Sequence, residues 1–197
     1  MPKTNFIVEA VDNLGKDTLI NNLQQKLGHY IVHHYQKPII TDKERSSECL
    51  NSSEMARLAQ ERAFELGFQQ LHTGIPTIFN RFHIGEYVYG PIYRHYDAEY
   101  IFDLEKKYDS HHLQWNTILV LLITTDFSFI EDDGLSFDVT KQRQEQVKFI
   151  EAVNKSNLAN KMIIDVHDGY GDFRPAEDIC DQVIKFARER NILPLVS

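Results

Sequence analysis

Phe6-Ile-Val-Glu-Ala-Val-Asp-Asn-Leu-Gly-Lys-Asp-Thr18 joins a short apolar run to a segment with helical periodicity. The helical pattern begins at Lys16, and Gly28 ends it. A strand that passes through Gly-Lys into a helix is typical of a phosphate-binding loop, where backbone N–H groups surround phosphate oxygens and the helix N-terminus adds positive potential. In such a loop Gly15 permits close approach, Lys16 reaches the outer phosphates, and a nearby hydroxyl or carboxylate helps to hold Mg²⁺.

The match to the phosphate-loop pattern G-x-x-x-x-G-K-[ST] is incomplete. Ala10 stands where the first Gly belongs, and Asp17 stands where Ser or Thr normally follows the Lys. The alternative is an ordinary strand–turn–helix junction that contains Gly-Lys by accident. The strand before the loop and the helix after it favour phosphate binding.

The rest of the chain alternates between apolar runs and helical patterns, with a helix break expected at Gly90-Pro91. Strands that alternate with helices form a parallel sheet covered on both faces. The sequence therefore predicts an α/β fold with three layers and a central five-stranded parallel sheet, as one domain over residues 1–197. We expect strands at residues 6–11, 30–35, 75–79, 116–124 and 162–166, and helices near residues 16–27, 52–71, 84–108, 139–154 and 175–190.

A second polar motif, Gly74-Ile-Pro-Thr-Ile-Phe-Asn-Arg81, places Asn80 and Arg81 at the end of the third expected strand. Ligands of open parallel sheets bind at the carboxyl ends of the strands, where the phosphate loop also lies. Arg81 can therefore face the same ligand, and its guanidinium suits a phosphate because it forms paired hydrogen bonds and stays charged. The alternative is a surface arginine at a strand end.

Composition excludes several classes of protein without selecting an enzyme. The net charge of −8 argues against a nucleic-acid partner, although a few local cations with Mg²⁺ can still bind a small phosphorylated ligand. No apolar run approaches the roughly 18 to 20 residues that a membrane span needs, and the N-terminal sequence lacks signal-peptide architecture. Two distant cysteines, Cys49 and Cys180, are typical of a reducing cytoplasm.

The two motifs and the order of the elements resemble the thymidylate kinase family of P-loop nucleotide kinases over most of the chain. Residues 6–18 are similar to the family's F-I-x-F-E-G-x-D-x-x-G-K-[ST]-T. Residues 74–81 are similar to its G-x-x-V-x-x-D-R, and Phe82 follows where an aromatic residue is common. The resemblance implies a P-loop kinase fold and a kinase that transfers the γ-phosphoryl group of ATP, with Mg²⁺, to a deoxynucleoside monophosphate, dTMP or a related pyrimidine.

Weaker similarities extend the resemblance. Gln36-Lys37-Pro38 is faintly similar to the family's R-E-P turn, and Arg62, or alternatively Arg57, to an arginine of its third helix region. Residues 81–94 and 132–136 resemble virus-encoded members, which implies a phage or viral origin and a host cytoplasm. The family commonly forms dimers through helices, so the resemblance also allows a homodimer.

The resemblance implies a role for each matched residue. Asp12 would approach the acceptor's sugar hydroxyl and Arg81 its phosphate, Asp17 or Thr18 would lie near Mg²⁺, and residues 126–138 would form a lid over ATP. The helical spacing of the tyrosines indicates packing for most of them, but Tyr87 and Phe68 are candidates to stack on the base. The expected donor-binding residues are Asn13, Leu14, Gly15, Lys16, Asp17 and Thr18, and the expected acceptor-binding residues are Asp12, Lys37, Arg57, Arg62, Phe68, Asn80, Arg81 and Tyr87.

Two departures from the family pattern bear on catalysis. Asn80 replaces an Asp, so one carboxylate near Mg²⁺ is missing, and Asp17 can compensate for it only in part. Thymidylate kinases take a catalytic arginine from the phosphate loop or the lid, but residues 126–139 contain neither Arg nor Lys. Because phosphoryl transfer requires neutralised charge at the transferred group, Arg94, Lys141 or Arg143 must substitute, or the enzyme is slow.

Two other functions stay open. The first is a deoxynucleoside kinase of related fold, which usually has a carboxylate base just beyond the second strand. This chain has Gln36-Lys37-Pro38 there, and the absence of a carboxylate argues against this function. A catalytically weak nucleotide-binding protein is suggested by Ala10, Asn80 and the arginine-free lid. A histidine metal site is disfavoured, because neighbours such as His33 and His34 point to opposite faces of a strand.

Overall fold

The computed structural model describes residues 4–35, 52–130 and 139–193. Its central sheet has the strand order β2-β3-β1-β4-β5, and all four pairings are parallel, which confirms the predicted five-stranded sheet. The near-continuous apolar runs of the two middle strands β1 and β4 are buried, as expected of parallel strands covered on both faces. The strands are β1 (Asn5–Ala10), β2 (Ile31–His34), β3 (Thr77–Asn80), β4 (Thr117–Ile123) and β5 (Asn160–Asp165).

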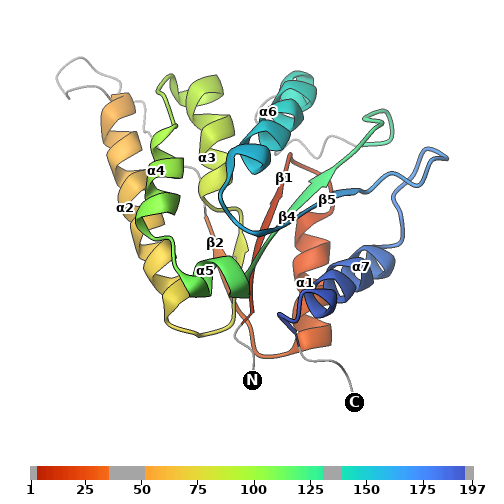
Figure 1. Ribbon diagram of the computed structural model, residues 1–197. Helices are drawn as coiled ribbons and strands as arrows, with labels where there is room; N and C mark the ends of the chain where they lie inside the picture. Colours follow the sequence, from red (N-terminus) through yellow and green to blue (C-terminus); the bar gives the residue numbers. More distant parts are fainter. Residues whose placement is uncertain (1–3, 36–51, 131–138, 194–197) are drawn as a thin grey trace.

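Helices cover both faces of the sheet (Figure 1). On one face α1 (Lys16–Leu27) packs beside α7 (Ala176–Glu189). On the other face α3 (His83–Tyr89) packs beside α6 (Gln142–Lys155), which follows a single 3₁₀ turn, η2 (Val139–Lys141). The predicted three-layer α/β fold is therefore confirmed. The second layer continues through α2 (Ser52–His72), α4 (Tyr100–Lys107) and α5 (His111–Asn116).

The segment between β3 and β4 differs from the single broken helix expected near residues 84–108. Helix α3 continues past Tyr89 into a π-helical turn, η1 (Gly90–Arg94), and the break comes at His95, which has a φ of 59°. Pro91 lies near the start of this turn and has no N–H to donate to the preceding turn of α3, and the helix continues past it in the wider π-helical form. Helix α5 was not predicted, although Ser110 caps it by accepting a hydrogen bond from the Leu113 N–H at 3.1 Å.

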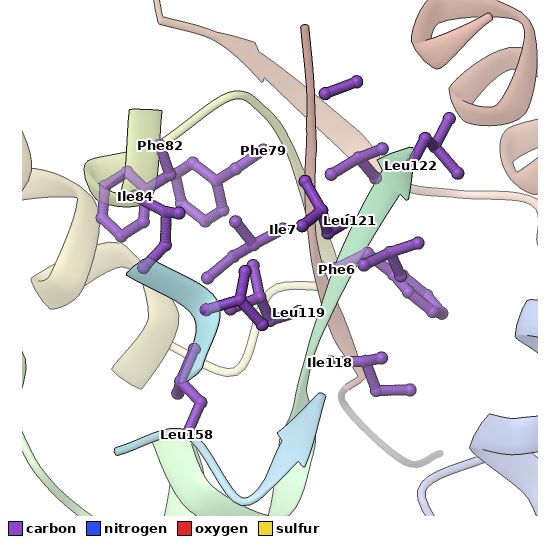
Figure 2. Packing of buried hydrophobic residues seen from close by; sticks show 14 of the residues in the cluster. Phe6, Ile7, Phe79, Phe82, Ile84, Ile118, Leu119, Leu121, Leu122 and Leu158 are labelled. Atoms are coloured by element: carbon purple, nitrogen blue, oxygen red, sulfur yellow. The ribbon is translucent and has the colours of Figure 1, made fainter. Parts of the chain in front are cut away.

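The core lies between the sheet and the α3 layer on one side and between the sheet and α1 and α7 on the other. Figure 2 shows Phe6 and Ile7 of β1 among side chains of β4, with Ile7 on the same side of the strand as Phe79 and Phe82 and Phe6 on the opposite side. The rings of Phe79 and Phe82 stack with centroids 4.6 Å apart. Because these two aromatic residues flank Asn80 and Arg81 in the sequence, their packing fixes the backbone from which both polar side chains extend.

Candidate active site

The loop between β1 and α1 has the backbone shape that a phosphate loop requires. Asn13 and Gly15 both adopt left-handed conformations, with φ of 65° and 74°. Leu14 between them is buried and anchors the loop to the core. No neighbouring heavy atom lies within 4 Å of the position that a Cβ on Gly15 would take, so this glycine supplies backbone freedom next to open space.

Lys16 brings the loop together with the end of β3. Its Nζ donates to Asn80 Oδ1 at 2.5 Å and lies 3.4 Å from Asp17 Oδ1. The Asn80 amide in turn donates to Asp17 Oδ1 at 2.5 Å, and its nitrogen lies 2.9 Å from His34 Nδ1 at the end of β2. The last side chains of β2 and β3 therefore meet the first two side chains of α1 at one point.

The neighbouring charges shift the pKa values of Lys16 and Asp17. Burial lowers the pKa of Lys16, and the nearby Arg81 cation lowers it further, against the attraction of Asp17. Burial tends to raise the pKa of Asp17, but the Lys16 ammonium and the Asn80 amide outweigh it and the pKa falls. Asp17 is therefore an anion at neutral pH, and its side chain is 74% exposed.

Arg81 forms a second group beside the loop. Its guanidinium donates to Asp12 Oδ1 and to the Tyr89 hydroxyl, and it also lies over the Tyr89 ring at 5.0 Å from the centroid. Arg81 has a φ of 64°, an uncommon left-handed conformation for a residue other than Gly. The turn after β3 thus directs Arg81 toward the phosphate loop rather than toward solvent.

Glu9 is a site residue that sequence reasoning missed. It is fully buried at the end of β1, and its Oε1 accepts hydrogen bonds from the backbone N–H groups of Phe82 at 2.8 Å and Gly85 at 3.2 Å. Burial raises its pKa to about 7, although the charges of Arg81 and Lys16 oppose this shift. The available signal was a carboxylate inside the apolar run Phe6–Val11, which a strand buried on both faces does not otherwise tolerate.

Some predicted residues lie in other contacts. Phe68 is fully buried against Phe82 and Tyr108, so no part of its ring is exposed for the base stacking expected of it. The Tyr87 hydroxyl, also expected near a base, donates instead to Glu151 of α6 at 2.6 Å. Both side chains are used in packing because helical spacing placed them on the inner faces of α2 and α3.

The predicted arginines of α2 differ in their surroundings. Arg57 pairs with Glu61 at 2.9 Å and lies over the Tyr100 ring, whereas Arg62 is 82% exposed and pairs with Glu65. Of the two alternatives, Arg57 is therefore the one that contacts the α4 side of this layer.

The candidates for the missing catalytic cation are also distinguished by their contacts. Arg94 forms a buried ion pair with Glu86 and donates to the Tyr96 hydroxyl at 2.9 Å. Arg143 stacks over the Phe127 ring at 5.2 Å, and Lys141 lies 5.0 Å from the Tyr93 ring.

The remaining predicted site residues lie partly inside and partly outside the described ranges. Thr18 is described and is exposed on the first turn of α1. Lys37 lies outside the described residues, as does the part of the expected lid at residues 131–138.

Over the ranges 4–35, 52–130 and 139–193, no three His, Cys, Asp or Glu side chains are grouped so that they could hold a metal ion by themselves. Within the same ranges no helix has the length and apolarity to cross a membrane.

A parallel sheet whose first strand ends in a Gly-Lys loop defines the P-loop kinase class of α/β folds, and comparison with solved structures agrees. The YorR protein of Bacillus subtilis, in complex with phosphorylated GDP, superposes with a TM-score of 0.64 at 17% identity, covering 98% of this chain and 100% of that one. The thymidylate kinase of Candida albicans gives 0.59 at 16% identity, covering 98% and 95%, and that of Ehrlichia chaffeensis gives 0.57 at 16% identity, covering 95% and 100%.

No protein-family model matches the chain, and no curated protein matches it. The similarity found by comparison with known proteins is therefore structural. It establishes a thymidylate kinase-like P-loop kinase fold for this chain.

Proposed function

We propose that this protein is an ATP-dependent kinase that transfers the γ-phosphoryl group to a deoxynucleoside monophosphate, with dTMP or a related pyrimidine nucleotide as the acceptor. One observation carries the proposal. Lys16 follows β1 and the ion-paired Arg81 follows the neighbouring strand β3, so both lie at the same edge of the sheet, where the Arg81 cation lowers the pKa of Lys16. Two cations so placed suit two phosphorylated ligands side by side.

The donor half of the site is the β1–α1 loop. Lys16 would exchange its side-chain oxygen partners for the outer phosphate oxygens of ATP, while the loop backbone surrounds them. Mg²⁺ usually binds proteins through one or two carboxylates together with substrate phosphates, and the exposed Asp17 with the Thr18 hydroxyl fits that requirement. When bound, the ion would neutralise charge on the phosphates.

The acceptor half is the Arg81 group. Arg81 carries five N–H donors, and its bonds to Asp12 and Tyr89 leave others for an acceptor phosphate. The ion pair holds Asp12 beside the same ligand, where its second oxygen could accept a sugar hydroxyl. Positioning and charge neutralisation are the main demands of phosphoryl transfer, and this arrangement supplies both.

A catalytically weak nucleotide-binding protein is the second candidate, and one observation favours it. Arg94, one of the cations expected to replace the lid arginine, is held in a buried pair with Glu86 rather than at the loop. The acceptor base is also open, because the YorR protein carries a phosphorylated guanine nucleotide. The experiment therefore needs a panel of acceptors that includes purines.

A coupled assay of ADP release tests the proposal, with Mg²⁺, ATP and each common deoxynucleoside monophosphate and deoxynucleoside in turn. We expect turnover with at least one pyrimidine monophosphate, and Lys16→Ala should reduce kcat by about 10²- to 10³-fold, as loss of a transition-state donor does. Lys26→Ala is the matched control, because Lys26 lies at the far end of the same helix and pairs with Asp181 on the surface. ATP binding without ADP release for any acceptor would favour the second candidate, and turnover of nucleosides alone would identify a nucleoside kinase.

A further inference from the structure

Glu9 is a buried carboxylate with an unusual set of partners. Its Oε1 accepts two backbone N–H groups, and its Oε2 is buried with no hydrogen-bond partner among the described residues. A carboxyl group in this environment is unfavourable unless its contacts compensate for lost hydration. A leucine would fill the same space at lower cost, so packing alone does not account for Glu9.

Both N–H groups that Glu9 binds belong to the turn that carries Arg81. Phe82 directly follows Arg81, and Gly85 lies in the first turn of α3, where backbone N–H groups have no helical acceptor. Phe82 is the N-cap residue of α3 and its side chain makes no capping bond, so Glu9 satisfies these groups from the neighbouring strand.

This turn is strained, which is why an external anchor matters. The left-handed conformation of Arg81 is unfavourable for a residue with a Cβ. On its other side the Arg81 N–H donates to the Val8 carbonyl at 3.0 Å. Val8 and Glu9, consecutive residues of β1, thus hold the turn on both sides of Arg81.

The contact also needs the glycine at position 85. A Cβ there would lie 3.2 Å from Glu9 Oε2, closer than such atoms usually approach. Around the carboxyl group the charged and titratable side chains are Lys16 of α1, Asp12 of the loop, Arg81 itself, and Tyr89 of α3, which Glu145 of α6 approaches in turn. Apart from Lys16, which belongs to the donor half, the neighbours of Glu9 are residues at or beside the acceptor half of the site.

We propose that Glu9 is a positioning residue for the acceptor: it holds the β3–α3 turn so that the Arg81 guanidinium meets the acceptor phosphate. The inference rests on the proposed function, since it assigns Arg81 that ligand. Glu9 itself touches no substrate. Its effect should therefore fall on acceptor binding and leave the binding of ATP by the loop almost unchanged.

Three variants of the full chain test this role. Glu9→Ala removes the acceptor of both N–H groups, Glu9→Gln keeps an oxygen for them, and Glu9→Asp withdraws the carboxylate by one methylene. Asn5→Ala is the matched control, because Asn5 is a buried polar residue at the opposite end of β1 that also accepts a backbone N–H, from Thr77 at 3.1 Å. The measurements are KM for dNMP, KM for ATP, and the Kd for dNMP by calorimetry without ATP.

We expect Glu9→Ala to raise both the KM and the Kd for the acceptor by about tenfold, with the KM for ATP within about twofold of wild type. Glu9→Gln should restore the acceptor values to within about threefold of wild type. Asn5→Ala should lower the melting temperature without separating the two KM values. If Glu9→Ala does not fold, the comparison of Glu9→Asp with Glu9→Gln tests the role instead, because Glu9→Asp should weaken acceptor binding more than Glu9→Gln does.

Equal changes in both KM values, or an unchanged acceptor KM in Glu9→Ala, would overturn the role of Glu9 while the kinase function stands. A wild-type chain that binds no mononucleotide would instead overturn the proposed function, and this inference with it.

Discussion

Asn80 hydrogen-bonds both a cation, Lys16, and an anion, Asp17, and a carboxylate at position 80 would be repelled by the anion. Its amide nitrogen lies 2.5 Å from Asp17 Oδ1, and its oxygen accepts from Lys16. An Asp at position 80 would place a second carboxylate beside Asp17, and Lys16 would be the one lysine that contacts both of them. The sequence therefore carries one carboxylate in this pair, on α1 instead of on β3.

The exchange of these two side chains is testable. Asn80→Asp should lower the free energy of unfolding by about 1 kcal/mol at neutral pH, because the two carboxylates repel each other. Adding Asp17→Asn should recover most of that loss, since the amide–carboxylate pair is rebuilt in the opposite order. Urea unfolding of the two single variants and the double variant measures the coupling. Strictly additive changes would show that the two side chains do not interact.

Glu9 also gives the protein a distinctive dependence of stability on pH. Its pKa is about 7 in the folded chain against 4.5 for an exposed Glu, so between these values the folded state binds more protons than the unfolded state. Stability due to Glu9 is complete below pH 4.5 and is lost as the pH rises toward 7. A shift of this size corresponds to about 3 kcal/mol.

Glu9→Gln cannot titrate, so its stability relative to wild type should rise between pH 5 and pH 8, by up to about 3 kcal/mol. Glu105→Gln is the contrasting control. Burial tends to raise the pKa of Glu105, but the hydrogen bond from His83 helps to lower it below the usual value. The contribution of Glu105 ionisation to stability should therefore not change between pH 5 and pH 8. Chemical denaturation at several pH values measures both. A constant difference between Glu9→Gln and wild type would mean that Glu9 stays ionised throughout.

At the scale of elements, α2 and the end of β3 approach each other unusually closely at Gly67. A Cβ on this residue would lie 2.2 Å from the Tyr35 hydroxyl and 2.4 Å from the Phe82 ring. In a helix interior Ala is favoured over Gly by about 1 kcal/mol, but forcing a methyl group into a packed core costs about 1 to 3 kcal/mol. The steric effect should therefore prevail.

Gly67→Ala should accordingly destabilise the protein by up to about 2 kcal/mol instead of stabilising it. Because Phe82 follows Arg81, acceptor binding should weaken as well. Gln69→Ala, on the exposed side of the same helix, controls for helix propensity alone. Thermal unfolding of the two variants measures the difference, and a more stable Gly67→Ala would show that α2 can move away from the ring.

The strands were predictable from their apolar runs, which are buried in β1, β3 and β4 although not throughout β2 and β5, and all five lie within about two residues of the expected positions. The β3–β4 connection was less predictable. Helix α5 has only six residues and little beyond Ser110 to announce it, while the π-helical turn at Gly90 extends a helix through a proline. Short irregular helices depend on tertiary contacts that sequence periodicity does not reveal.

The candidate site divides in the same way. Lys16, Asp12 and Arg81 could be named from motifs, because the carboxyl ends of parallel strands meet at one edge. His34, Tyr89 and the bonds of Glu9 could not, because they depend on which way each side chain points after folding. Phe68 is fully buried and the Tyr87 hydroxyl bonds Glu151 in this structure, so both aromatic residues serve in packing, and their role as base contacts stays a prediction. The roles of the remaining residues stay predictions.

For the whole molecule, the strand order explains why the site has two halves. β1 lies in the middle of the sheet, so the loop at its end adjoins the end of β3 on one side, while β4 and β5 end on the other. The donor loop and the Arg81 turn are therefore parts of one continuous sheet edge, built on strands buried in the core. Such rigid support is what positioning of two phosphates requires.

The most direct test follows the transferred group itself. Wild-type protein is incubated with ATP labelled in the γ-phosphoryl group, Mg²⁺ and an unlabelled deoxynucleoside monophosphate, and the products are separated by anion exchange. We predict that the label appears in the nucleoside diphosphate, and that Arg81→Lys reduces its formation at low acceptor concentration by about tenfold because the paired hydrogen bonds are lost. Label that stays in ATP, or appears only in inorganic phosphate, for every acceptor would contradict the proposed function.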